Sequence, residues 1–373
     1  MALDSPRIAE RATLLRISPY QPARWLPAAT MLCLSLGVLA TLASPRGIVA
    51  GPPDANASQA DASADKPDEE AAPAEQVDFG MSLKAEGGGL KNVIGTVTVP
   101  AEWPNQQRVR EVKREIPPGA TVSYKLIEDV GRQMTVKIPS LPPGKEVRAV
   151  VTFEVRRLTV PPPSEDAGRL TCPDARTAGR KMAVCLAPSP KIESDDPQVR
   201  QTAQEATAGL TGAWEKVQAI HQWVHKNITF TGDLENVQTC PQTLQRRHGV
   251  CAELNSLTVA MLRASRFPAR LVRIPNHVYY EVYLLDSEGG GHWLAGDAGA
   301  RPTITLDDRP GGMILQKGDN VSITDPGTHR RTKGRILSET ATGTSLTPAA
   351  RVQFQPISPA FKESPSPSGR GPG

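Results

Sequence analysis

Three residues in the C-terminal half of the chain have side chains that together could carry out thiol chemistry: Cys251, His277 and Asp297. A cysteine thiolate is a nucleophile, an imidazole can take and return its proton, and a carboxylate can orient the imidazole. Each residue alone has a more ordinary interpretation, because a free cysteine is usually inert packing and an aspartate often forms a turn. Their occurrence in this order, each in a suitable local pattern, favours a nucleophile, its base and an orienting carboxylate.

Cys251 stands at the start of a pattern that predicts an amphipathic helix. The apolar residues after it recur at helical spacing and include Leu254, Leu257, Met261 and Ala264. We therefore expect Cys251 at a helix N-terminus, where unpaired N–H groups and the positive end of the helix dipole favour the thiolate over the thiol.

His277 opens a run that predicts a β-strand with one buried face, because apolar and more polar residues alternate over 277–285. Asp297 follows after a glycine-rich turn at 289–291 and a short strand that contains Trp293. A hairpin of this length brings Asp297 back beside the strand of His277. There its carboxylate can fix the tautomer of the imidazole and stabilise the imidazolium.

The order of these motifs resembles the transglutaminase-like superfamily of papain-type thiol enzymes. The resemblance covers roughly residues 214–319 and rests on ordered agreement over about a hundred residues, which is a stronger signal than a lone cysteine. Its further parts are a helical pattern from Val217 to Ile228, the phrase Gly249-Val250-Cys251 and the run Phe267-Pro268-Ala269-Arg270. It implies catalytic roles for Cys251, His277 and Asp297. The chain departs from the family at Phe230, where an aromatic hydroxyl is common, and at Ala298-Gly299, where a proline is often found.

A zinc site is the alternative interpretation of the cysteines and histidines. The spacings of His221, His225, Cys240 and His248 match no common zinc pattern, and the chain has no Cys-x-x-Cys pair. On the helix 217–228, both histidines flank the apolar stripe, so we expect them in a solvated or rim position. The sequence therefore predicts no metal site.

Other classes of ligand are disfavoured by what the sequence lacks. The net charge of +4 is spread thinly over 373 residues, and no aromatic residues interleave with a basic stripe, which argues against nucleic acid. No glycine-rich phosphate loop follows a strand, so no nucleotide or organic cofactor is expected. A calcium loop of the Asp-x-Asp-x-Asp-Gly kind is also missing, which favours calcium-independent hydrolysis.

The N-terminal part predicts export. Within residues 1–50, the first 24 residues contain four arginines, and an uncharged, leucine-rich stretch follows at 25–45, so this segment is either a cleaved signal peptide or an uncleaved membrane anchor. In both cases the remainder is placed in the periplasm or cell envelope, in the second case anchored to the inner membrane. Residues 51–76 contain mainly Ala, Asp, Glu, Pro and Ser and predict a disordered acidic linker.

The remaining chain predicts an α+β protein with two folded parts. Short alternating runs punctuated by Gly and Pro over 77–162 indicate a β-sandwich. Its expected role is a scaffold, and positioning of the substrate is the alternative. An irregular connection is expected over 163–199, and a transglutaminase-like core of helices on an antiparallel sheet over 200–335. Residues 336–373 are expected to form a disordered Pro/Ser-rich tail.

The cysteines outside the apolar N-terminal stretch fit an oxidising compartment. Cys172 and Cys185 lie in the irregular connection and are close enough in sequence to form a disulfide. Cys33 lies in the apolar stretch, and Cys240 is left over, either buried or able to cap Cys251 reversibly.

Taken together, these patterns predict an exported thiol enzyme that acts on a peptide or protein amide. The acyl-enzyme would be resolved by water, as in a peptidase or amidase, or by an amine, as in a crosslinking transglutaminase, and we favour water. A non-catalytic envelope protein that binds peptide in the same cleft is the alternative from a different class. The sequence carries no signal of the oligomeric state.

Overall fold

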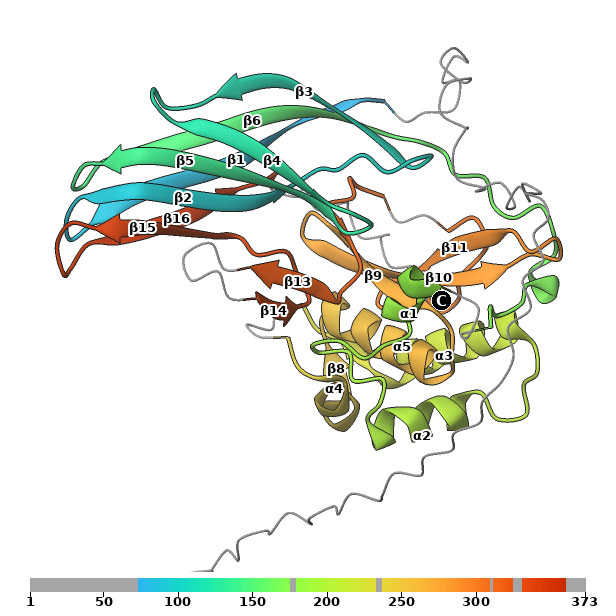
Figure 1. Ribbon diagram of the computed structural model, residues 1–373. Coiled ribbons are helices and arrows are strands. Elements are labelled where there is room, and N and C mark those ends of the chain that lie inside the picture. The colour runs from blue at the N-terminus through green and yellow to red at the C-terminus, as the bar shows by residue number, and fades with distance from the viewer. Residues whose placement is uncertain (1–72, 175–178, 233–236, 309–310, 325–330, 360–373) are drawn as a thin grey trace, which may run out of the picture. The chain divides into compact units, whose positions relative to one another are not determined.

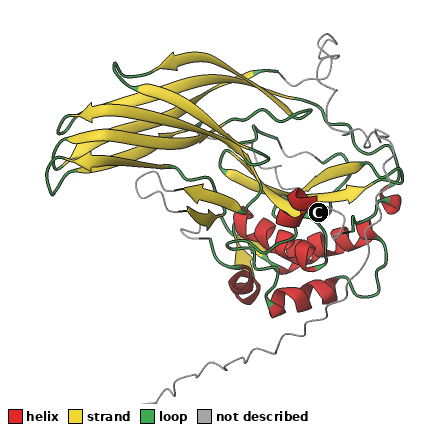
Figure 2. Cartoon of the chain, viewed as in Figure 1, coloured by secondary structure: helices red, strands yellow, loops and turns green. Residues whose placement is uncertain are grey.

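The computed structural model describes residues 73–174, 179–232, 237–308, 311–324 and 331–359 (Figures 1 and 2). The predicted signal or anchor, Cys33 and nearly all of the predicted acidic linker lie outside these residues. Within the described residues, no helix has both the length and the apolar content needed to cross a membrane.

The first folded part is a pair of antiparallel sheets that enclose an apolar core, which confirms the predicted sandwich architecture. One sheet has the strand order β16, β1, β6, β3, with β16 (Arg351–Ile357), β1 (Glu75–Glu86), β6 (Glu146–Arg157) and β3 (Gln107–Glu115). Facing it are β15 (Thr340–Ser345), β2 (Leu90–Val99), β5 (Gly131–Leu141) and β4 (Thr121–Ile127). Alternate residues of β6 are buried, as expected for strands that cover a core on one side.

Two parts of this sandwich differ from the sequence-based expectation. The predicted disordered tail contains β15 and β16, which pair with β2 and β1 respectively. β16 has a short alternating pattern in which Val352 and Phe354 pack against the sandwich core. The sequence does not predict β3, because charged residues occupy most of its positions. The alternation of apolar and polar residues that indicates a strand with one buried face is therefore not visible there.

The second folded part packs helices against an antiparallel sheet, as predicted. The helices are α2 (Pro197–Ala206), α3 (Ala213–Asn227), α4 (Cys240–Arg246) and α5 (Cys251–Ala264). The sheet consists of β11 (Gly291–Gly296), β10 (His277–Leu285), β9 (Ala269–Ile274) and β12 (Gln316–Lys317), in that order. Because β12 also pairs with β5, this sheet continues into the sandwich sheet. The helices lie below the strands β9 to β11 in Figure 1.

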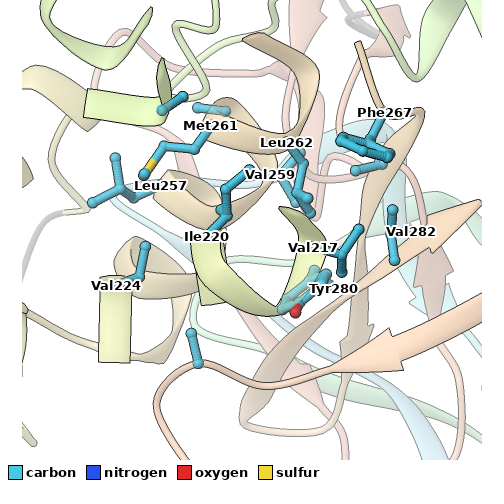
Figure 3. Close-up of a cluster of buried hydrophobic side chains, with 14 of the residues drawn as sticks. Val217, Ile220, Val224, Leu257, Val259, Met261, Leu262, Phe267, Tyr280 and Val282 are labelled. Atoms are coloured by element: carbon cyan, nitrogen blue, oxygen red, sulfur yellow. The ribbon is translucent and has the colours of Figure 1, made fainter. Parts of the chain in front are cut away.

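The α5 helix is the centre of this second part, and it is buried on almost all sides rather than amphipathic. Its residues from Glu253 to Arg263 are all buried. One side packs on β9 and β10, while α2, α3 and α4 cover the others. A helix enclosed on every side needs no polar face. Figure 3 shows Leu257, Val259 and Met261 of α5 in this core.

The sheet is likewise covered on both faces, whereas the sequence predicted one buried face for the strand of His277. In β10, Tyr280 and Val282 face the helices, but Tyr279 and Glu281 are also buried. The second face packs against Ile314 and the half-buried Trp103. The sequence pattern of β10 does not reveal this second buried face, because the residues that cover it come from segments distant in sequence.

The predicted irregular connection 163–199 contains short helical segments. These are the 3-10 helix η1 (Ala167–Arg169), α1 (Gly179–Val184) and the start of α2. The side chain of Asp196 accepts hydrogen bonds from the N–H groups of Gln198 and Val199, and Pro197 occupies the first turn. This N-cap explains why α2 begins before residue 200.

The predicted disulfide between Cys172 and Cys185 is not formed, and both thiols are free. Thr171 forms a bridge with Leu285 at the end of β10, and the Cys172 thiol then donates a hydrogen bond to the carbonyl of Arg266. Burial raises the pKa of Cys172 to about 11 and also raises the pKa of Cys185. Closeness in sequence therefore did not translate into a bond between the two sulfurs.

Candidate active site

Cys251 is the first residue of α5, as the sequence predicted. The helix start is held by Glu253, which is almost fully buried. Its Oε2 accepts a hydrogen bond from the N–H of Val250 (3.1 Å), and its Oε1 accepts one from the N–H of Gln238 (2.6 Å). Gly249 leaves room for this carboxylate, because a Cβ at residue 249 would lie 2.5 Å from Glu253 Oε2.

Two short strands bring another segment to the same end of α5. β7 (Thr229–Phe230) pairs in parallel with β8 (His248–Gly249), which leads into Cys251. The Phe230 side chain is 52% exposed. Phe230 thus presents a largely exposed apolar ring beside the strand that leads into Cys251.

His277 is placed by a tight hairpin between β9 and β10. The register pairs His277 with Ile274, and Asn276 in the connection adopts a left-handed conformation with φ of 56°. Asparagine tolerates this conformation better than most residues. His277 Nε2 donates a hydrogen bond to Asp297 Oδ2 at 2.6 Å, and the imidazole also hydrogen-bonds to the thiol of Cys251.

Asp297 directly follows β11, and the β10–β11 register places Gly296 opposite Tyr280. The predicted return of the aspartate to the strand of His277 is therefore confirmed. Asp297 Oδ1 accepts hydrogen bonds from Asn255 Nδ2 (3.0 Å) and from the N–H of Gly299 (3.1 Å). The structure thus brings all three predicted residues together.

Asn255 is a positioning residue that the sequence analysis missed. It lies on α5 one turn after Cys251 and is fully buried. Its Nδ2 also donates to the carbonyl of Val278 (2.8 Å), and its Oδ1 accepts from the N–H of Ala298 (3.0 Å). The sequence does contain a signal for this role, because Asn255 follows the cysteine at the helix start by four residues and lies within an otherwise apolar run. Asn255 ties α5 to both segments that carry the other two residues.

The charges of the cluster favour an ion pair between Cys251 and His277. Burial opposes ionisation of the thiol, but the hydrogen bond and charge of His277 and the N–H of Val278 outweigh it and lower the pKa of Cys251. Burial also opposes the imidazolium, yet hydrogen bonds with Asp297 and Cys251 raise the pKa of His277 to about 10. Asp297 has a lowered pKa although burial works against it, because His277, Asn255 and Gly299 all donate to its carboxylate.

His221 and His225 do not belong to this cluster. His221 is fully buried, not solvated as expected, with Nδ1 against the hydroxyl of Tyr280 (2.8 Å) and Nε2 against the carbonyl of Arg301 (2.8 Å). Burial lowers the pKa of His221, so the ring is neutral and packs the core. His225 is half-buried and contacts the carbonyl of Ala298 through Nδ1 (2.9 Å).

Cys240 is buried at the start of α4, which fits the first of the two expected alternatives. Its N–H donates to Glu193 Oε2, and its thiol contacts the carbonyl of Lys191. Burial raises the pKa of its thiol strongly. In the described parts of the chain, no group of three or more His, Cys, Asp or Glu side chains is arranged to hold a metal ion.

Comparison with known proteins agrees with the fold. Residues 200–298 match the transglutaminase-like superfamily and form a transglutaminase-like domain. The structure of a "putative cysteine protease" from Cytophaga hutchinsonii is similar, with a TM-score of 0.50 and 17% identity, over 78% of this chain and 93% of the other. This likeness shows the same fold.

A "putative protease" from Parabacteroides distasonis also matches, with 15% identity over 57% of this chain and 43% of its own and a TM-score of 0.25. No curated protein matches the sequence.

Proposed function

We propose that the protein is a thiol acyl-transfer enzyme in which Cys251 is the nucleophile, His277 the acid and base, and Asp297 the residue that orients His277. The observation that carries the proposal is the 2.6 Å hydrogen bond from His277 Nε2 to Asp297. The same imidazole is hydrogen-bonded to the thiol of Cys251 at the start of α5. A buried thiol without a function has no need of an oriented imidazolium beside it.

In the first half of the reaction, the Cys251 thiolate attacks the carbonyl carbon of a peptide or protein amide. A carbon–sulfur bond forms while the carbonyl π electrons move onto oxygen. When the tetrahedral intermediate collapses, the carbon–nitrogen bond breaks and the His277 imidazolium gives its proton to the departing amine. The products are a thioester on Cys251, a free amine and a neutral imidazole, and Asp297 stays ionised throughout.

In the second half, neutral His277 takes a proton from water as the water oxygen attacks the thioester. The carbon–sulfur bond breaks, and the thiolate and imidazolium are restored with release of a carboxylic acid. We favour water over an amine as the acceptor, so the proposed activity is that of a peptidase or amidase. The alternatives are transfer to an amine, as in a crosslinking transglutaminase, and peptide binding without catalysis.

The three possibilities separate in one experiment with p-nitrophenyl acetate as acyl donor. The proposed hydrolase forms an acetyl thioester on Cys251 and releases acetate, and added glycine ethyl ester changes the product little. A transglutaminase instead converts most of the acyl group into the amide of that amine. If the protein releases p-nitrophenol from the donor no faster than the Cys251→Ala variant does, the protein is a binder. Cys172→Ser serves as the matched control, because Cys172 is another free, partly buried thiol.

We further propose that the protein is exported to the periplasm or cell envelope, and that residues 25–45 direct or anchor it there. The support is the run of arginines before the apolar stretch. The free thiols of Cys172 and Cys185 remove the disulfide argument for export. A reporter enzyme that works only outside the cytoplasm, fused after residue 76, should be active, and Leu36→Arg should silence it. Activity that survives Leu36→Arg would contradict the proposal.

A further inference from the structure

Phe230 presents an exposed aromatic ring at the edge of the proposed active site. The residue is 52% exposed, and β7, which ends with it, pairs with the strand that leads into Cys251. A single exposed apolar side chain is ordinary on a protein surface. The position of this ring, rather than its exposure alone, is what indicates a function.

Gly299 brings the ring together with a carboxylate of the proposed active site. A Cβ at residue 299 would lie 3.6 Å from Phe230 Cδ2 and 3.5 Å from Asp297 Oδ1. The buried Leu254 is the next neighbour, with its Cδ2 at 3.8 Å. These are ordinary van der Waals distances, so the missing side chain leaves a space about as large as a methyl group. Gly299 itself is partly exposed, so this space can be reached from solvent.

The segment that carries Gly299 is fixed by hydrogen bonds. Ala298 donates its N–H to Asn255 Oδ1 (3.0 Å), and its carbonyl contacts His225 Nδ1 (2.9 Å). The N–H of Gly299 donates to Asp297 Oδ1 (3.1 Å). The space beside the ring is therefore preformed, and a preformed surface binds a ligand at a lower cost in conformational entropy than a mobile one.

The surroundings of the ring favour an apolar ligand over a cation, although an aromatic ring can bind either. Oδ1 of Asp297 accepts hydrogen bonds from Asn255 and Gly299. Its Oδ2 accepts one from His277. Glu253, in the first turn of α5, accepts from two backbone N–H groups. Both carboxylates already bind donors within the fold, so a cationic ligand would have to compete for them.

We propose that Phe230 determines the acyl-donor specificity of the proposed enzyme by packing against an apolar side chain of the residue whose carbonyl Cys251 attacks. The end of that side chain enters the space beside Gly299. The substrate class is therefore a peptide or protein amide with a short apolar side chain on the acyl side of the scissile bond. This inference rests on the proposed function, because it assumes that the thiol of Cys251 is the reacting atom.

Two acyl donors that differ only in apolar length test the proposal. p-Nitrophenyl butyrate has two more carbons than the acetate, and these stand for the first two carbons of a side chain. The kcat/KM for release of p-nitrophenol measures formation of the thioester. Each methylene that leaves water contributes about fourfold, so the butyrate should react roughly tenfold faster than the acetate. Phe230→Ala should reduce this ratio to less than about twofold, whereas Phe230→Leu keeps an apolar side chain and should retain part of the ratio.

Gly299→Ala tests the place of the apolar group independently of the ring. The added methyl group makes only ordinary contacts, and the N–H that donates to Asp297 is kept, so the variant should fold with an unchanged melting temperature. Because the methyl group fills the space, the butyrate-to-acetate ratio should fall as it does in Phe230→Ala. An unchanged ratio in Gly299→Ala would overturn the proposed placement.

Leu346→Ala is the matched control for Phe230→Ala. Leu346 is similarly exposed, at 54%, but it lies between β15 and β16 of the sandwich. Its loss should leave the ratio unchanged. An equal fall of kcat/KM for both donors in Phe230→Ala, with the ratio preserved, would overturn the proposal, because the ring would then only support the fold.

Two results with the unsubstituted protein would also contradict the proposal. A butyrate-to-acetate ratio near one would show that no apolar group is bound. A rate that rises further from butyrate to octanoate would indicate a groove for a long acyl chain rather than a place for a short side chain. Failure of the proposed function looks different, since no donor would then release p-nitrophenol faster with the protein than with Cys251→Ala.

Discussion

The central residue-scale question is whether Cys251 and His277 act as one unit. His277 holds the thiol ionised and also moves the proton, so removal of either residue should abolish both halves of the reaction. We expect Cys251→Ala and His277→Ala each to lower acyl transfer from p-nitrophenyl acetate by about 10³-fold or more, and the double variant to be no slower than the slower single variant. Asp297→Asn should leave a measurable residual rate. Losses that multiply in the double variant would contradict a shared mechanism.

The pH dependence of Cys251 reactivity should reveal the ion pair directly. His277 lowers the pKa of the thiol, so the midpoint of the pH profile for alkylation by iodoacetamide should lie below the ordinary thiol pKa of 9.0. Acyl transfer should also fall on the alkaline side, as His277 loses its proton near pH 10. In His277→Ala, burial of the thiol is no longer outweighed, so the midpoint of the alkylation profile should rise. An unchanged midpoint would show that His277 does not set the thiolate.

The residues of the cluster could be predicted from the sequence, but the residues that hold them could not. Cys251, His277 and Asp297 each open or follow a recognisable helix or strand pattern. Asn255 does not, because its role depends on where distant segments meet α5. An asparagine in a helix is an ordinary residue until its contacts are known.

At the scale of elements, the start of α5 depends on a close fit between Gly249 and Glu253. The Glu253 carboxylate is fixed by two backbone N–H groups and cannot move aside for a Cβ at residue 249. Gly249→Ala should therefore lower the free energy of unfolding by about 1–3 kcal/mol and slow alkylation of Cys251. Urea denaturation and the iodoacetamide rate measure the two effects.

The matched control for this substitution is Gly168→Ala. A Cβ at residue 168 would have its nearest neighbour at an ordinary 3.8 Å. It should change the free energy of unfolding by less than about 0.5 kcal/mol. If Gly249→Ala changed the free energy of unfolding as little as this control, the start of α5 would not require a glycine at residue 249.

Element types were predicted better than element environments. The α5 helix and the β10 strand were expected, but each was expected to have one exposed face. Neither element has an exposed face, because Ile314 and Trp103 cover the second face of β10 and the other helices surround α5. Periodicity reports the strongest buried face of an element, and polar residues such as Asn255 and Glu281 then look solvated although they are buried and paired.

At the scale of the whole described structure, a buried ionic network joins the sheet of the second part to the sandwich. Lys317 Nζ donates to Glu281 Oε1 (2.6 Å) and to Gln106 Oε1 (2.6 Å), while Arg270 pairs with the other oxygen of Glu281. Nearby, Gln107 contacts both the N–H and the carbonyl of Ile314. These polar contacts fix β12 between the two parts.

A double-mutant cycle on Glu281 and Lys317 tests this network. Glu281→Leu leaves two cations buried without their carboxylate and should cost about 3–5 kcal/mol of unfolding free energy. Lys317→Met should cost less, because Arg270 still pairs with Glu281. The double variant should be less destabilised than the sum of the two single variants, as measured by urea denaturation. Strict additivity would mean that the ion pair contributes nothing specific.

The C-terminal strands decide where the folded structure ends, and truncation tests this. Composition predicted a disordered tail from residue 336, because Pro, Ser and Gly dominate its far end, yet β15 and β16 occupy edges of the two sandwich sheets. β16 pairs with β1 from Gly80 to Glu86, and β15 pairs with β2.

A variant that ends at residue 338 loses both ladders and should be less stable by at least about 3 kcal/mol, since each backbone hydrogen bond contributes roughly 0.5–1.5 kcal/mol. A variant that ends at residue 359 keeps both strands and should match the full chain within about 0.5 kcal/mol. Equal urea midpoints for the two truncations would restore the tail interpretation and remove β15 and β16 from the fold.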